Sequence, residues 1–285
     1  MNNPIDEAVH ELIKKKLNDL EAYLQADVIV YYGEIFDSVE VQMKKIVEEL
    51  QSDKCKHNKC YIMLTTPGGS LNPVNRMVTV FRHFYVEVNF IIPNYAYSAG
   101  TIFCMSGDNI FMNYYSALGP VDPQVQNKDG KLVAALGYLD KINELLEKAR
   151  NNTISQAEFL ILKDFDLAEL RAYEQAKELA IDLIKKWLVK YKFKDWTKHS
   201  DGREVSIEDR EERATEIAEK LSDNNIWKSH GRAITIQELE EMRLKVNDYG
   251  KDNTLQKLID EYYAVLVDYV QKYQNRVFVH TRRFL

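Results

Sequence analysis

The first half of the chain alternates short apolar runs with amphipathic stretches, and this alternation limits the fold more than any other feature. The apolar runs, rich in Val, Ile and Tyr, are residues 27–33, 60–66 and 87–93; residues 37–51 and 71–84 between them have the apolar spacing of helices. Strands separated by helices indicate an α/β fold with a largely parallel sheet. In such folds ligands bind at the carboxyl ends of the strands.

After residue 150 the pattern changes to long, charged amphipathic helices. Residues 155–191 and 254–273 have this pattern, and a polar insert at 192–212 separates two helices, the second starting near Ser206 or Ile207. We therefore expect one integrated domain. Its two parts are an α/β core with an amino-terminal helix over residues 1–150 and a helical extension packed on that core over residues 151–285.

Composition narrows the class of protein. The 285 residues have a formal net charge of −6, which argues against a general nucleic-acid-binding protein. No apolar run approaches the roughly 20 residues that a membrane span needs, and the amino-terminal stretch is too charged for a secretion signal. The three cysteines suit a reducing compartment. We expect a cytoplasmic protein that neither binds nucleic acid nor crosses a membrane.

The stretch "CKHNKC" raises the possibility of a metal site. Cys55, His57 and Cys60 are possible ligands, but their spacing matches no common zinc pattern and no second ligand pair follows. The pattern favours a polar turn before a strand, and we expect no metal.

A glycine pair follows the second predicted strand. In "TTPGGSLNP", Gly68 and Gly69 lie between a strand and a helix, in a turn whose backbone amides can point to one spot and bind an anion. The stretch lacks the Lys-Ser/Thr pair of a Walker loop and is not a GxGxxG motif. Taken alone, it favours an ordinary strand-to-helix turn over an anion site.

A serine follows the next strand in a similar position. In "YAYSAGT", Ser98 precedes Ala99 and Gly100, which are small enough for a helix to start close to the sheet. Because the ends of consecutive parallel strands lie at the same edge, we expect the glycine turn beside Ser98. A nucleophile with backbone amides around it is the arrangement that acyl transfer requires. The expected amide donors are those of Gly69, Ala99 and, as a further candidate, Gly68.

These motifs together resemble a known family. "PGGS", then "AYSAGT" about 30 residues later, then "SALGPVDPQ" are similar to the Clp-protease and crotonase superfamily, above all to its serine dehydrogenase proteinase branch, which is related to ClpP and signal peptide peptidase A. The resemblance covers residues 25–126 and resumes at "LSDNNIWKSHGRAIT".

The resemblance implies a spiral of β-β-α units and a serine endopeptidase that cuts peptides or unfolded protein through an acyl-enzyme. It also implies a homo-oligomer. No dinucleotide fingerprint accompanies the word "dehydrogenase", so we expect no cofactor.

The general base is not settled by the motifs. In ClpP a histidine lies about 25 residues after the serine, where this chain has Asp122, and an ordinary carboxylate is a weak base for a hydroxyl. The serine dehydrogenase proteinase branch has its triad in the order serine, aspartate, histidine, and Ser98, Asp122 and His230 occur in that order. His230 would be the base and Asp122 would orient it. Asp122 as a simple turn residue and His230 as a helix-end residue stay open.

A lysine is the competing base, as in the signal peptide peptidase relatives. Lys148 lies 50 residues after Ser98, and Lys141 lies 43 residues after it. Both are on an amphipathic segment where lysines are usually solvated, whereas a catalytic lysine must be desolvated to lower its pKa.

Two other functions and one interface also stay open. A crotonase-type acyl-CoA enzyme would use the same amides to hold a thioester enolate and would not need Ser98, and an assembly protein would keep the fold without catalysis. The last predicted helix is rich in tyrosine, which suits a subunit interface or packing on its own core: Tyr262, Tyr263, Tyr269 and Tyr273.

Overall fold

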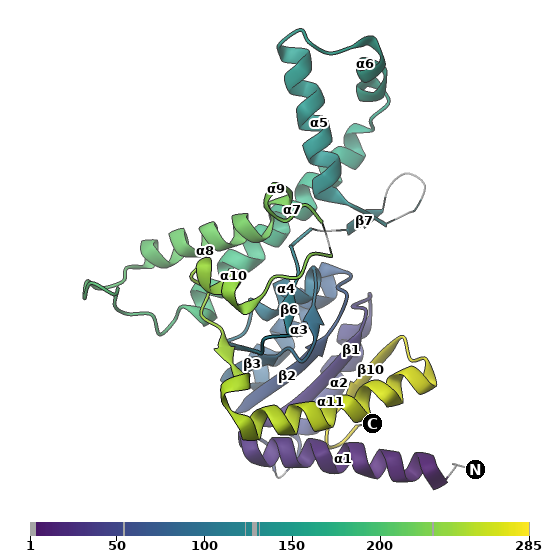
Figure 1. Ribbon diagram of the computed structural model, residues 1–285, viewed down its shortest axis with the longest axis vertical. Helices are drawn as coiled ribbons and strands as arrows, with labels where there is room; N and C mark the ends of the chain where they lie inside the picture. Colours follow the sequence, from purple (N-terminus) through teal and green to yellow (C-terminus); the bar gives the residue numbers. More distant parts are fainter. Residues whose placement is uncertain are drawn as a thin grey trace.

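A mostly parallel six-stranded sheet forms the centre of the protein (Figure 1). The computed structural model describes residues 4–53, 55–122, 124–126, 130, 132–229 and 231–284. The strand order in the sheet is β10-β1-β2-β3-β5-β9. These strands are β1 (Asp27–Gly33), β2 (Lys59–Thr65), β3 (Glu87–Ile91), β5 (Asn109–Met112), β9 (Asn247–Asp248) and β10 (Val277–His280).

The three predicted strands are β1, β2 and β3, and they pair in parallel, as expected. Ile29 is opposite Ile62, and Ile62 is opposite Phe90, so the sheet has a continuous apolar centre. β5 and β9 continue the parallel order, and only β10 runs antiparallel, beside β1. The predicted α/β fold with a largely parallel sheet is confirmed.

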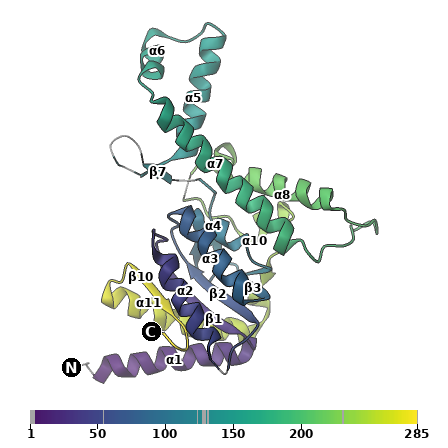
Figure 2. The same cartoon turned by 180° about the vertical axis from the view of Figure 1, so that it is seen from behind.

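Helices cover both faces of the sheet, which explains why its strands are apolar throughout (Figures 1 and 2). In β1, Ile29 and Tyr31 belong to the core under α2 (Val39–Gln51) and α3 (Leu71–Phe84). The alternate residues Val28 and Val30 belong to the core under α1 (Pro4–Leu24) and α11 (Asn253–Tyr273). Burial of both sets removes apolar surface from water, which stabilises the fold by roughly 25 cal/mol for each Å² that is buried.

The helices between residues 135 and 241 form an arm that projects from the sheet and then returns to it (Figure 1). The expected helical stretch 155–191 is divided by a break at residues 164–166, where the Asp166 side chain accepts a hydrogen bond from the Ala168 amide and starts a new helix. The expected start near Ser206 is confirmed, because Ser206 and Asp209 form a capping box. The helices are α5 (Ala135–Arg150), α6 (Gln156–Lys163), α7 (Leu167–Trp187), a π-helix (Leu188–Lys192), α8 (Ile207–Leu221), α9 (Asn224–Trp227) and α10 (Ile236–Glu241).

The carboxy-terminal half is more than a helical extension. It supplies both edge strands of the central sheet, because β9 pairs with β5 and β10 pairs with β1. These strands are two and four residues long, too short to give a clear period-2 signal in the sequence. The remaining short elements are β4 (Tyr95–Ala96), α4 (Ala99–Cys104), β6 (Ala117–Leu118), β7 (Gln124–Gln126), β8 (Leu132–Ala134) and a 3-10 turn (Tyr249–Lys251).

The tyrosine-rich helix α11 packs on the protein's own core, one of the two expected roles. It lies along α1, where the Tyr269 hydroxyl is 2.8 Å from His10 Nε2. Tyr262 is fully buried and stacks on His280. No helix in the described ranges is long and apolar enough to cross a membrane. Nor do the described residues contain a group of three or more His, Cys, Asp or Glu side chains that could hold a metal ion.

The buried His280 predicts a pH-dependent stability. Burial lowers the pKa of His280 from 6.5 to about 3, so the folded protein holds it neutral while the unfolded chain takes up a proton below pH 6.5. The contribution of the neutral His280 to the stability of the folded protein is therefore complete above pH 6.5 and is lost as the pH falls below that value. We expect the free energy of unfolding, measured by urea titration, to drop by about 1 kcal/mol from this residue between pH 7 and pH 5.5.

The variant His280→Gln keeps a polar group for the Tyr262 hydroxyl. It should reduce the slope of the unfolding free energy against pH between pH 5.5 and pH 7. His83→Gln is the matched control, since His83 is exposed on α3 and its replacement should leave the slope intact. An unchanged slope in His280→Gln would contradict the assignment.

Candidate active site

Ser98 occupies a sharp turn between β4 and α4. Its backbone has φ 53° and ψ −116°, a region that residues other than glycine rarely adopt, and the residue is only 4 % exposed. Strain of this kind costs of order 1–3 kcal/mol and persists where the surrounding structure imposes it, most often at functional sites. The turn is therefore a candidate nucleophile position on geometric grounds alone.

The glycine turn lies directly against Ser98, as expected from the parallel strand ends. Gly68 has φ 106°, and a Cβ atom added to it would lie 2.8 Å from the Ser98 Cβ and 3.3 Å from the Ala99 amide nitrogen. Only a residue without a side chain allows this approach. The structure thus brings together the serine, the turn and the first amide of α4.

The backbone amides of the turn have different partners. The Gly68 amide donates a hydrogen bond to Thr66 Oγ1 at 3.0 Å and is occupied. The turn is fixed on its other side by Ile35, whose amide donates to the Gly68 carbonyl at 2.8 Å. Within the described part of the chain, the amides of Gly69 and Ala99 have no hydrogen-bond acceptor. The expected set of three donors is therefore reduced to Gly69 and Ala99.

Thr66 joins the glycine turn to the strand before Ser98, a role that the sequence reasoning missed. Its amide donates to the Tyr95 carbonyl at 3.1 Å, and its carbonyl accepts from the Tyr97 amide at 2.9 Å. A Cβ on Gly100 would lie 2.4 Å from the Thr66 Cγ2 atom, which explains the small residue there. The signal available in the sequence was a polar residue at the end of a buried apolar strand.

Thr101 is a second positioning residue that the sequence reasoning missed. Its buried hydroxyl is 2.8 Å from the carbonyls of both Ala96 and Gly119 and accepts a hydrogen bond from the Gly119 amide at 3.0 Å. These contacts join the start of α4 to the segment that follows β6. That segment leads directly to Asp122.

Asp122 is buried next to Ser98, but its carboxylate has another contact. The Ser98 hydroxyl donates to the main-chain carbonyl of Asp122 at 3.4 Å. Asp122 Oδ1 accepts a hydrogen bond from the Leu136 amide at 3.0 Å, at the start of α5. The residue is thus at the candidate site, and part of its carboxylate is engaged in holding the helical arm.

His230 lies outside the described residues. The segment a few residues after it pairs with a short strand that neighbours the strand before Ser98. The Ile234 amide donates to the Leu118 carbonyl at 2.7 Å, and the Leu118 amide donates back at 3.0 Å. Leu118 in β6 is the parallel partner of Ala96 in β4, two residues before Ser98. The segment that follows position 230 is therefore one strand away from the strand that leads to the serine.

Lys148 and Lys141 lie on α5 and form ion pairs. Lys148 Nζ is 2.9 Å from Glu144 Oε1 and 2.7 Å from Glu158 Oε1, and these hydrogen bonds raise the pKa of Lys148 above its ordinary value. Lys141 Nζ is 2.9 Å from the other oxygen of Glu144. A general base needs a neutral amine, so these contacts oppose the use of either lysine in that role.

Comparison with known proteins decides the family. The model of the ClpP-like SDH-type serine proteinases matches residues 23–206, more than half of the chain, and this range contains Ser98 and the glycine turn. The chain belongs to this family. The expected resemblance to the serine dehydrogenase proteinase branch is confirmed.

Two curated relatives are similar to this chain over part of its length. Two uncharacterized proteins of Methanocaldococcus jannaschii are 28 % and 27 % identical over 186 and 187 residues; these stretches cover 65 % of this chain and 51 % and 52 % of theirs. The chain thus spans about half the length of the curated relatives that it matches.

Three solved structures have a similar mixed α/β fold. A mutant of the 1510-N membrane-bound stomatin-specific protease has a TM-score of 0.46 and 15 % identity, covering 80 % of this chain and 82 % of that one. Another mutant, in complex with a substrate peptide, has a TM-score of 0.43 and 17 % identity, covering 78 % and 76 %. The ClpP catalytic domain from Plasmodium falciparum has a TM-score of 0.41 and 13 % identity, covering 86 % and 90 %.

Proposed function

We propose that this protein is a serine peptidase that hydrolyses peptides or unfolded protein segments through an acyl-enzyme on Ser98. The observation that carries the proposal is the strained Ser98 turn packed against Gly68, with the Gly69 and Ala99 amides unoccupied in the described part of the chain. Membership of a serine proteinase family supports it independently. Acyl transfer uses these parts, a nucleophile and two fixed amide donors.

In the proposed reaction, Ser98 Oγ attacks the carbonyl carbon of the scissile peptide bond while the base takes the hydroxyl proton. The negative charge that develops on the carbonyl oxygen accepts hydrogen bonds from the Gly69 and Ala99 amides. The carbon–nitrogen bond then breaks as the base returns the proton to the leaving amine. Water, deprotonated by the same base, attacks the ester carbon. The carbon–oxygen bond then breaks, the base returns the proton to Ser98 Oγ, and the acid product is released.

We assign the base to His230 and its orientation to Asp122. Support comes from the position of Asp122 beside Ser98 and from the pairing of Ile234 with β6, four residues after His230. Lys148 is the alternative base; its two carboxylate partners stabilise the charged ammonium and so favour His230.

A fluorophosphonate probe tests the nucleophile, because it reacts only with an activated serine. We expect the wild-type protein to be labelled on Ser98 and the Ser98→Ala variant to be unlabelled. Ser70→Ala is the matched control, since Ser70 precedes α3 in the same glycine turn and is more accessible. Ser106→Ala is a second control, on a buried serine two residues after α4. Labelling that survives in Ser98→Ala, or a folded wild type that is not labelled, would overturn the proposal.

The same assay compares the two bases. His230→Ala should lower the labelling rate of Ser98 by orders of magnitude, because the members of a catalytic triad act as a unit. Lys148→Ala should retain the rate, since it removes only ion pairs on the arm. The reverse result would assign the base to Lys148 and leave Ser98 as the nucleophile.

A further inference from the structure

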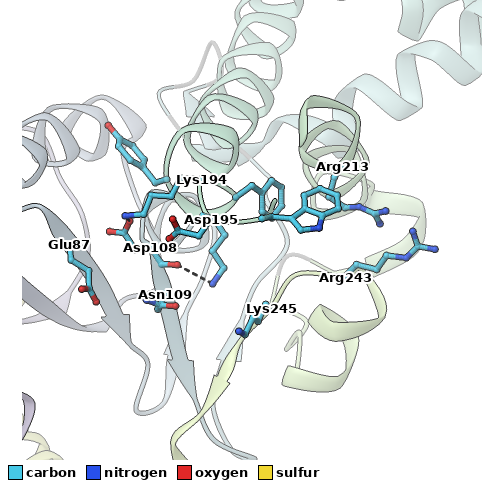
Figure 3. Close-up of a pocket in the computed structure, with 12 residues that line it drawn as sticks. Glu87, Asp108, Asn109, Lys194, Asp195, Arg213, Arg243 and Lys245 are labelled. Carbon is cyan, nitrogen blue, oxygen red and sulfur yellow. Dashed lines mark hydrogen bonds and ion pairs between the residues drawn. The ribbon is translucent and has the colours of Figure 1, made fainter. Parts of the chain in front are cut away.

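A cavity lies at the end of the sheet opposite to Ser98, where the parallel strands begin. It has a volume of about 630 Å³ and opens where β3 and β5 begin, at Glu87 and Asn109 (Figure 3). Ser98 follows the carboxyl end of β3, so the cavity is separate from the candidate active site. Its size is within the usual range for small-molecule sites, about 300–1,000 Å³.

Cations are concentrated in this cavity. Its lining includes five of them from three parts of the chain, together with three carboxylates. Two of the five already have carboxylate partners: Lys194 Nζ is 2.5 Å from Asp108, and Arg213 is 3.1 Å from Glu216. The other three, which have no carboxylate partner in the described ranges, are Lys192, Arg243 and Lys245.

The unpaired cations line one cavity, and two of them, Lys192 and Lys245, interact electrostatically. Lys192 is directed inward, where its Nζ donates to the Asp108 main-chain carbonyl at 3.4 Å. Burial and the neighbouring Lys245 charge lower the pKa of Lys192 to about 8. Figure 3 shows the Arg213 and Arg243 side chains reaching to the same side of the cavity. An anion placed among these groups would relieve their mutual repulsion.

The wall between these cations is aromatic. Phe193 and Trp196 line the cavity and pack edge to face, with ring centroids 5.8 Å apart. Asp195 also lines the cavity and has no ion pair in the described part of the chain, so its carboxylate is available to accept hydrogen bonds from hydroxyl groups. The lining of this cavity therefore combines three kinds of group: cations, aromatic rings and a carboxylate without an ion pair in the described residues.

We infer that this cavity, the basic pocket of Lys192, Arg243, Lys245, Phe193 and Trp196, is a binding site for a nucleoside monophosphate. The cations bind the phosphate, the rings stack on the base, and Asp195 accepts from the sugar hydroxyls. Arg243 and Lys245 lie beyond the residues that the family model matches, so the cavity is formed partly by residues outside that match.

Calorimetric titration of the full chain tests this inference with AMP, GMP, CMP and UMP at pH 7. At least one nucleotide should bind, and its nucleoside and inorganic phosphate should each bind at least tenfold more weakly. Lys245→Gln and Arg243→Gln should each weaken nucleotide binding by tenfold or more. Trp196→Leu should weaken binding of the nucleotide without changing that of phosphate.

The control is Lys251→Gln, which alters an exposed lysine six residues after Lys245 that does not line the cavity and should have no effect. Ser98→Ala should bind the nucleotide as the wild type does, so failure of the peptidase proposal and failure of this one give different results. Absence of binding by all four nucleotides at millimolar concentration would overturn the inference. So would equal affinity for nucleotide and phosphate, or an equal effect of Lys251→Gln and Lys245→Gln.

Discussion

Replacing Gly68 with alanine is expected to lower the rate of Ser98 acylation by about a hundredfold or more while the protein stays folded. The added Cβ would lie 2.8 Å from both the Ser98 Cβ and the Tyr97 carbonyl, so the glycine turn and the serine must move apart. In the proposed site, the Gly69 and Ala99 amides would then no longer donate to the same oxygen, and loss of one such donor costs about 10²–10³ in rate. Fluorophosphonate labelling kinetics measure this effect, and circular dichroism checks the fold.

Gly202→Ala separates the effect on the site from backbone strain. Gly202 also has a positive φ, 88°, but a Cβ on it would have no atom within 4 Å. This control therefore introduces a similar conformational cost in an exposed turn, without touching Ser98. Equal labelling rates in Gly68→Ala and wild type would contradict the assignment of this turn to the oxyanion site.

The sequence was sufficient to predict the meeting of Ser98 and the glycine turn, because both follow parallel strands and strand ends share one edge of the sheet. The sequence could not show which backbone amides of the turn already donate a hydrogen bond within the protein. The Gly68 amide is bound by the side chain of Thr66, and this bond depends on the turn geometry rather than on a motif. The strained backbone of Ser98 was also invisible, since "YSAGT" is compatible with a simple helix start.

The edges of the sheet were the least predictable part of the fold. β10 consists of four residues and is stabilised by pairing with β1, some 250 residues earlier in the chain, so no local pattern identifies it. The division of the stretch 155–191 was readable in principle, because Asp166 is a good helix cap. The helical spacing of apolar residues continues through the break, so the sequence pattern did not indicate it.

Replacing Arg282 with alanine is expected to destabilise the protein by about 3–5 kcal/mol, the largest stability effect of the substitutions considered. Arg282 follows β10 and is 13 % exposed; its guanidinium is 2.7 Å from Asp27, which is fully buried, and 3.2 Å from Glu21. Asp27 Oδ2 also accepts hydrogen bonds from Tyr85 and Gln51 and cannot turn out to solvent. Truncation of the arginine leaves two buried carboxylates without their cation. Urea denaturation at pH 7 measures the loss.

The adjacent arginine is the matched control, because Arg283 is half exposed and its one ion pair within the described residues, with Asp53, is 3.7 Å long. Arg283→Ala should leave the free energy of unfolding nearly unchanged. If the cost in Arg282→Ala comes from an uncompensated charge, the double variant Arg282→Ala with Asp27→Asn should recover part of it, since the neutral amide no longer requires a cation. A double variant less stable than Arg282→Ala would instead show that packing of the arginine stem, rather than charge, joins the carboxy-terminal strand to the first strand of the sheet.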